Sequence, residues 1–213
     1  MMIQSDFREW TLDKIDEVFG TQVAFSSPAL DKLLSFEYEF DAIESAFLNK
    51  ISKLYRHFGG EDWNETELEN KVISPLFVYA EMNSLDFSYF LERDLKIELE
   101  GYQLSGRVDG MIASGFRNPK QPYFCLSEYK KAKDPNGDPQ GQALIAMLVA
   151  QELNNEKHPV FGCYIVGRQW VFIVLEGKKY AFSKAFTIDD DEIFDIYRVL
   201  KSLKSQIEVW IEV

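Results

Sequence analysis

The sequence has few of the residues on which zinc sites and histidine-based catalysis depend. Its 213 residues include 2 cysteines and 2 histidines, and no Cys/His cluster with metal-ligand spacing occurs. Zinc binding, Ser-His-Asp catalysis and Cys-His catalysis are therefore weakly supported. Cys125 and Cys163 both lie in apolar, strand-like segments. We expect buried thiols there, because a disulfide is a poor match to a reducing compartment.

Long hydrophobic runs are also missing. The longest apolar stretch, ALIAMLVA (residues 143–150), is far too short to span a bilayer. The N-terminus, MMIQSDFREW, carries charges early and has no apolar core, so no secretion signal is expected. Hydrophobic residues make up 46% and charged residues 27%, as in ordinary globular domains. We therefore expect one cytoplasmic domain with no membrane partner.

Basic residues are scarce in the first half of the chain. Residues 1–100 hold 9 Lys/Arg against 21 Asp/Glu, a net charge of −12, whereas residues 101–213 hold 14 of each. Between residues 107 and 133, six basic residues stand against only Asp109 and Glu128. The overall charge argues against a non-specific nucleic-acid coat, but it permits an enzyme that meets a phosphate backbone at one basic patch. The acidic first half leaves a protein partner as a second possibility.

Hydrophobic periodicity predicts helices first and strands later. The expected helices cover residues 6–19, 28–36, 41–58, 64–83, 140–155 and 187–211. The expected strands are two between residues 95 and 113, followed by 123–132, 159–167, 169–177 and 179–186. Pro75 lies inside a helical pattern, so a kink or break is expected there, and residues 133–139 read as a turn-rich loop.

These elements predict a mixed α/β (α+β) protein with a mixed central β-sheet flanked by helices. We expect residues 1–60 to form a helical segment packed on a core of residues 61–213. No internal repeat, linker or low-complexity tract interrupts the chain.

The segment CLSEYKKAK (residues 125–133) places an acid and a base together at the end of an apolar strand. Side chains alternate along a strand, which puts on one face Phe124, Leu126, Glu128 and Lys130, and on the other Tyr123, Cys125, Ser127 and Tyr129. Asp109 lies on the preceding expected strand, and its carboxylate could converge with Glu128 and Lys130. Two carboxylates and a few waters are a common Mg²⁺ site. A solvated Glu-Lys pair and a structural Asp are the simpler alternative.

This order of features resembles the PD-(D/E)XK nuclease superfamily. Within it, the chain is similar to small bacterial proteins related to the N-terminal nuclease domain of type I restriction enzyme motor subunits. The resemblance covers residues 65 to about 153. It assigns the first motif to Asp109, although Val108 replaces the usual proline, and the second motif to Glu128, Tyr129 and Lys130. In this reading Tyr129 lends only its backbone carbonyl to the metal.

Two further site residues follow from the same resemblance. An acidic residue on the first core helix corresponds to Glu65, and Glu69, one turn further on the same face, stays open as the alternative. A glutamine on the helix after the second motif corresponds to Gln142, with Gln140 as the alternative. That helix can equally be explained by core packing alone.

The resemblance implies a restriction-endonuclease-like fold and metal-dependent hydrolysis of phosphodiester bonds, with DNA as the expected nucleic acid. The implied catalytic residues are Asp109, Glu128, Lys130, Glu65 and Gln142. The implied Mg²⁺ or Mn²⁺ ligands are Asp109, Glu128, the Tyr129 carbonyl, and Glu65 or Glu69. Two alternatives stay open: a catalytically silent module that binds nucleic acid or a protein partner, and a structural α/β protein whose charges form surface pairs.

Overall fold

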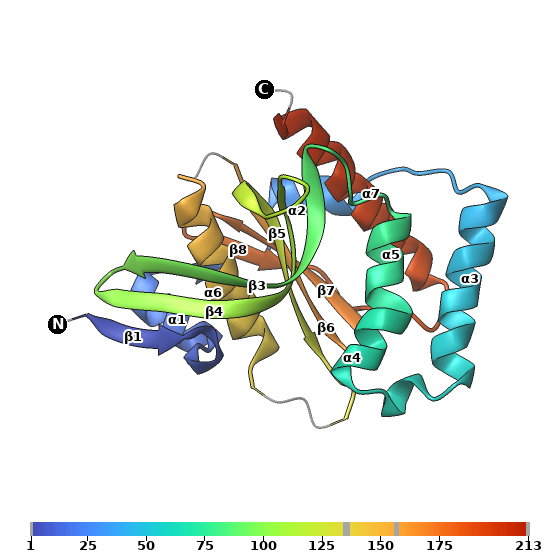
Figure 1. Ribbon diagram of the computed structural model, residues 1–213, viewed down its shortest axis with the longest axis horizontal. Helices are drawn as coiled ribbons and strands as arrows, with labels where there is room; N and C mark the ends of the chain where they lie inside the picture. The colour runs from blue at the N-terminus through green and yellow to red at the C-terminus, as the bar shows by residue number, and fades with distance from the viewer. Residues whose placement is uncertain (1, 134–136, 156–157, 212–213) are drawn as a thin grey trace.

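Within the part of the chain that the structure describes, nine strands form a mixed central β-sheet, and helices flank it (Figure 1). The structure, a computed structural model, describes residues 2–133, 137–155 and 158–211. The main strand order is β1-β4-β5-β6-β7-β8-β2, with β3 paired to β4 and β9 paired to β7. The predicted mixed α/β class is therefore confirmed. Of the predicted loop 133–139, residues 134–136 lie outside the described residues.

The strands are β1 (Ile3–Asp6), β2 (Gln22–Val23), β3 (Phe87–Leu99), β4 (Tyr102–Ser114), β5 (Lys120–Lys130), β6 (Val160–Val166), β7 (Gln169–Glu176), β8 (Lys179–Phe182) and β9 (Phe186–Thr187). The helices are α1 (Leu12–Phe19), α2 (Pro28–Leu34), α3 (Ala42–His57), α4 (Glu65–Leu68), α5 (Ser74–Tyr79), α6 (Pro139–Leu153) and α7 (Glu192–Ile211). Short turns η1 (Phe7–Glu9) and η2 (Gly60–Asp62) are 3-10 helical, and η3 (Glu69–Ile73) is a π-helical segment.

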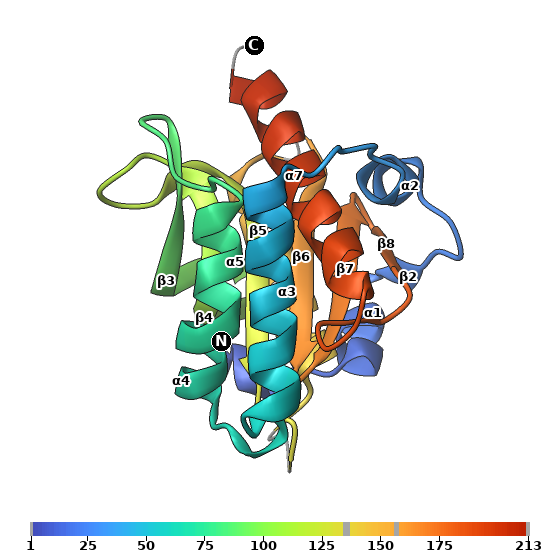
Figure 2. The same ribbon diagram turned by 90° about the vertical axis from the view of Figure 1, so that its right-hand side faces the viewer.

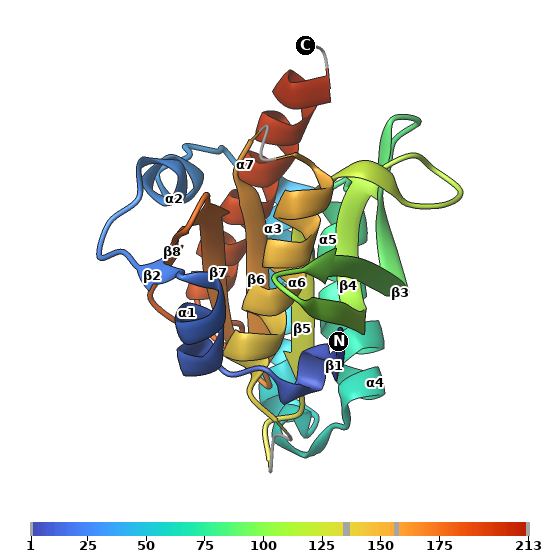
Figure 3. The same ribbon diagram turned by 90° about the vertical axis from the view of Figure 1, so that its left-hand side faces the viewer.

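The helices form two layers, one on each face of the sheet. Helices α3, α5 and α7 lie together on one face (Figure 2), and α6 and α1 lie on the other (Figure 3). Each layer has its own apolar core, and α6 is buried along most of its length. None of the helices in the described ranges is both long and apolar enough to cross a lipid bilayer. Both cysteines are free and buried, as predicted.

The sequence predicted a helical N-terminal segment, but in the structure this segment also contains strands. Strand β1 pairs in parallel with β4, and β2 pairs in parallel with β8 at the other edge of the sheet. The helix expected over residues 6–19 is also wrong at its start. The 3-10 turn η1 comes first, and Thr11 then caps α1 by accepting a hydrogen bond from the backbone N–H of Lys14. Residues 1–60 therefore contribute two strands to the central sheet and do not only pack on it as helices.

The helix predicted over residues 64–83 starts as expected and contains an irregular middle. Asn64 caps it in a reciprocal capping box with Glu67. Proline has no N–H for the regular helical bond, and its ring crowds the preceding turn. The chain widens into η3 just before Pro75 and then resumes as α5. The expected kink or break is therefore realised as a π-helical turn.

Two strand predictions need correction. Strand β3 begins at Phe87, not near residue 95, because the charged run after Leu91 obscures the start of this strand. In β5, the register against β4 shifts between Ile112 and Ala113. This bulge places Phe124 in the core of the α7 layer, with Cys125, so it does not share a face with Leu126 as the simple alternation predicted.

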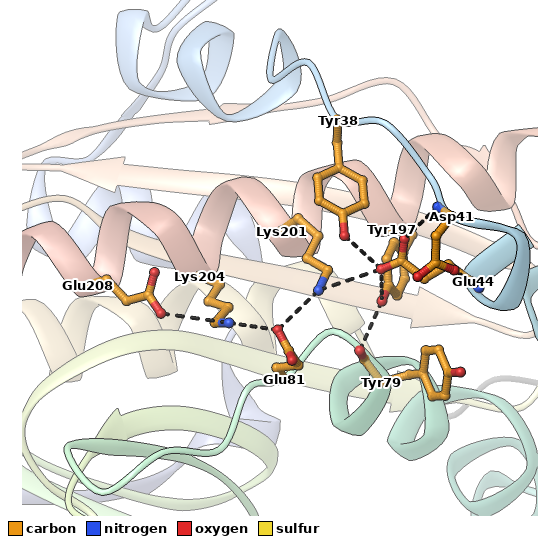
Figure 4. Close-up of polar contacts among 9 residues, drawn as sticks. All are labelled: Tyr38, Asp41, Glu44, Tyr79, Glu81, Tyr197, Lys201, Lys204 and Glu208. Carbon is orange, nitrogen blue, oxygen red and sulfur yellow. Dashed lines mark hydrogen bonds and ion pairs between the residues drawn. The ribbon is translucent and has the colours of Figure 1, made fainter.

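A polar cluster joins the N-terminal part of the chain to α7 (Figure 4). Its members are Tyr38, Asp41, Glu44, Tyr79, Glu81, Tyr197, Lys201, Lys204 and Glu208. The Glu44 carboxylate accepts hydrogen bonds from the hydroxyls of Tyr38, at 2.7 Å, and Tyr197, at 3.2 Å. The Lys201 ammonium lies 3.7 Å from the same oxygen and 3.3 Å from Glu81. Because Glu44 and Lys201 are largely buried, the cluster fixes α3 against α7.

Candidate active site where β4 and β5 diverge

Strand β4 pairs with β3 along one edge, but on its other edge the partner changes halfway along the strand, and this change creates the candidate site. Its second half pairs with β5 from Gly110 to Ser114, while its first half pairs with β1 from Tyr102 to Ser105. The two strands β4 and β5 separate beyond the Gly110–Ser127 pair. Asp109 and Glu128 are the next residues on the two strands, so their side chains point to the same face at the mouth of the gap.

Asp109 is held in this gap by the backbone of β5. Its Oδ2 accepts a hydrogen bond of 2.7 Å from the backbone N–H of Tyr129. Burial raises the pKa of Asp109, and the hydrogen bond from Tyr129 and the charge of Lys130 offset only part of this effect. The charge of Glu65 raises the Asp109 pKa further, because the two carboxylates lie close enough to repel each other.

Glu128 and Lys130 form a buried ion pair, not a solvated one. Their exposed fractions are only 7% and 9%, and the Lys130 ammonium contacts Glu128 Oε1 directly. Burial and the neighbouring charge of Asp109 raise the pKa of Glu128 to about 7, although Lys130 acts in the opposite direction. One lysine therefore does not neutralise this pair of carboxylates. The alternative in which these residues form a surface pair does not fit the structure.

A small polar pocket of about 380 Å³ opens beside this ion pair. Its walls are formed by Arg8, Glu65, Lys130, Gly137 and Gln142. These residues come from η1, α4, β5, the segment before α6, and α6 itself. Elements far apart in the sequence therefore meet at the end of β5.

The structure separates the two acidic candidates on the first core helix. Glu65, at the first position of α4, lines the pocket. Glu69 lies one turn further and is half-buried. Burial and the charges of Glu92 and Asp109 raise the pKa of Glu69. Glu65 therefore lies in the pocket wall. Glu69 does not line the pocket, but it is close enough to Asp109 for the two charges to repel each other.

The two glutamine candidates on α6 also differ in their surroundings. Gln142 is buried and lines the pocket, and its amide nitrogen donates to the backbone carbonyl of Asp138 at 3.3 Å. Gln140 instead donates to the hydroxyl of Tyr164 at 3.0 Å. Of the two, Gln142 is the one that shares the pocket with Lys130.

The Tyr129 side chain points away from the pocket into the opposite core. Its hydroxyl lies 2.8 Å from the hydroxyl of Tyr89, and the residue is buried. Only the backbone of Tyr129 reaches the gap, where its N–H binds Asp109. This position is compatible with the carbonyl role that the resemblance implies.

The donor set is compatible with a hard divalent cation, although it is not a complete cage. Within the described ranges, no three His, Cys, Asp or Glu side chains are grouped as a ready-made metal site. Mg²⁺ keeps several waters and is commonly bound through one or two carboxylates. Asp109 and Glu128 supply two, and burial raises the pKa of both. A cation between them would compensate the charge that Lys130 leaves unbalanced.

Two residues near the site were missed by the sequence reasoning. Arg8 reaches the pocket only because β1 pairs with β4, and no local sequence pattern announces that pairing. Glu92 lies on β3 between Leu91 and Arg93, which pair with Gly110 and Val108 on either side of Asp109, and its charge raises the Asp109 pKa. Glu92 could have been found only if β3 had been predicted at its full length.

Comparison with known proteins does not assign this chain to a family. No protein-family model matches the sequence, and no curated protein matches it.

Proposed function

We propose that the chain is a metal-dependent nuclease with a restriction-endonuclease-like core, acting in the cytoplasm on the phosphodiester bonds of DNA. One observation carries the proposal. Asp109, Glu128 and Lys130 gather at the gap between β4 and β5, beside a pocket that Glu65 and Gln142 also line. Two buried carboxylates and a lysine next to an open polar pocket match metal-assisted phosphodiester hydrolysis.

In this proposal Asp109 and Glu128 would hold Mg²⁺ or Mn²⁺, with the Tyr129 backbone carbonyl as a third ligand and Glu65 acting through bound water. Such an ion supplies an activated water and takes up negative charge on a phosphoryl oxygen. The Tyr129 N–H fixes one oxygen of Asp109 and thereby orients the other toward the gap. The burial that raises both carboxylate pKa values also favours the binding of a cation in place of protons.

Lys130 has the position needed to orient an attacking water and to offset charge in the transition state. Its ammonium is held by Glu128 and reaches the pocket wall. Gln142 presents an amide that can donate to a phosphate oxygen or to the water.

A second candidate function is supported by a separate surface. Large apolar side chains are exposed along and just after α3, with Ile43 at 69% and Phe58, directly after the helix, at 71%, and α5 exposes Val78 at 59%. A groove of about 1020 Å³ lies along α3 between Phe47 and Phe58. Exposed apolar patches commonly mark protein interfaces. A catalytically silent module that binds a protein partner through this face is the alternative to the nuclease.

Cleavage of supercoiled plasmid by the purified protein tests the proposal. We expect nicking or linearisation with millimolar Mg²⁺ or Mn²⁺ and none with chelator. Asp109→Asn should abolish cleavage by removing a ligand charge, whereas Asp94→Asn, an exposed acid on β3, should cleave like wild type. Absence of cleavage by a folded wild-type protein across metals and nucleic acids would favour the silent module.

A further inference from the structure

The N-terminal segment delivers an arginine to the candidate active site. Arg8 lines the same pocket as Lys130 and Gln142, although more than one hundred residues separate it from both. Its side chain is exposed, and no carboxylate of the described residues lies within ion-pair distance of its guanidinium. Lys130, in contrast, is buried against Glu128. Arg8 is therefore the pocket cation that is accessible to an incoming anion.

The position of Arg8 is fixed by the strand that precedes it. Residues Ile3–Asp6 pair in register with Tyr102–Ser105 of β4. The Asp6 side chain then caps η1 by accepting a 2.9 Å hydrogen bond from the backbone N–H of Arg8. Phe7, the first residue of the turn, and Trp10, directly after it, are buried at 3% and 0%. The turn that carries Arg8 is thus anchored on both sides.

Two glycines make room for this segment. A Cβ at Gly106 would lie 2.3 Å from the ring of Phe7, and a Cβ at Gly141 would lie 2.3 Å from the carbonyl oxygen of Trp10. Real side chains do not tolerate such contacts, so both positions need glycine for this packing. Gly141 lies on the first turn of α6, next to Gln142. The segment therefore packs directly against the helix that forms one wall of the pocket.

We propose that Arg8 binds a backbone phosphate of the nucleic acid next to the phosphate that is cleaved, which makes the N-terminal segment part of the substrate-binding site. This inference rests on the proposed function. A guanidinium presents paired N–H donors that match two phosphate oxygens, and an ammonium cannot reproduce that fork. The pocket also contains Glu65 and faces Asp109, which repel a phosphate. A cation at its rim offsets that repulsion where the backbone enters.

Binding of a fluorescein-labelled DNA duplex in chelator, followed by anisotropy at several salt concentrations, tests the inference without requiring cleavage. We expect Arg8→Ala to weaken binding by about tenfold and to lower the magnitude of the salt slope by about one. Arg8→Lys should restore the slope and only part of the affinity. Lys32→Ala, which removes one exposed positive charge on α2, outside the pocket and outside the basic segment 107–133, is the control and should bind like wild type.

The outcomes separate this inference from the proposed function. Equal affinity and equal salt slope for wild type and Arg8→Ala would overturn the role of Arg8, and so would a wild-type protein that does not bind the duplex. Weaker binding by Arg8→Ala together with no cleavage by wild type would support Arg8 and contradict the nuclease. A loss of affinity with an unchanged salt slope and a lower melting temperature would assign Arg8 a structural role and overturn the inference.

Discussion

At the scale of single residues, the site is defined by carboxylates whose charge is incompletely balanced. Glu128 has a lysine in direct contact, and yet burial and the charge of Asp109 raise its pKa from 4.5 to about 7. Structural ion pairs usually lower the pKa of their acid. The raised pKa distinguishes Glu128 from surface acids of the same protein. The pKa of Asp94, for example, is lowered by the neighbouring Arg107.

The raised pKa of Glu128 makes stability depend on pH in a defined direction. Between about pH 4.5 and 7 the folded state holds a proton that the unfolded state has lost, so the free energy of unfolding falls as pH rises through this range. In chelator, wild type should lose roughly 3 kcal/mol more than Glu128→Gln between pH 4.5 and 8. Urea denaturation at both pH values measures this, and parallel pH curves would contradict it.

At the scale of elements, the contact between η1 and β4 places the N-terminal segment at the site. Gly106→Ala should destabilise the fold by about 1–3 kcal/mol, because the new methyl group collides with Phe7. Phe7→Ala should cost about 3 kcal/mol through the cavity that it leaves. The double variant should cost clearly less than the sum, because the smaller residue 7 accepts the methyl group. Strictly additive losses in urea denaturation would show that the two residues are not in contact.

The sequence predicted the elements whose signals are local. The strand that carries Glu128 and Lys130 and the helix capped by Asn64 were both found from patterns of a few residues. The full length of β3 was not predicted, because the middle of this strand is charged. Such a charged segment is tolerated only in an edge strand, and which strand lies at an edge depends on the rest of the sheet. The bulge near Phe124 and the π-helical turn before Pro75 likewise depend on packing across strands and turns.

The same distinction holds for the candidate site. Asp109, Glu128 and Lys130 could be singled out because strand alternation and chain order suggested that they converge. The choice of Gln142 over Gln140 as the pocket-lining residue needed the orientation of α6. Arg8 could not be predicted, since a parallel pairing between β1 and β4 joins segments about one hundred residues apart without any signal in either.

At the scale of the whole molecule, polar as well as apolar contacts join helices of the same layer, as between α3 and α7. Burial and the charge of Glu44 raise the pKa of Tyr197, so its hydroxyl stays protonated and donates to the carboxylate (Figure 4). Glu44→Ala should cost about 3 kcal/mol, because buried Lys201 and two hydroxyls lose their partner. Glu39→Ala, an exposed neighbour, is the control and should change stability by less than about 0.5 kcal/mol. Equal midpoints in chemical denaturation would contradict the role of the cluster.

Lys130→Ala tests whether Lys130 assists hydrolysis at a metal site formed by Asp109 and Glu128, as the proposed function requires. Plasmid cleavage and Mn²⁺ calorimetry are measured on wild type and Lys130→Ala purified in parallel. Lysine is not a metal ligand, so we expect Lys130→Ala to bind Mn²⁺ and yet to cleave at least about a hundredfold more slowly. Equal cleavage by the two proteins would contradict the account, because the activity would then come from another site or another protein.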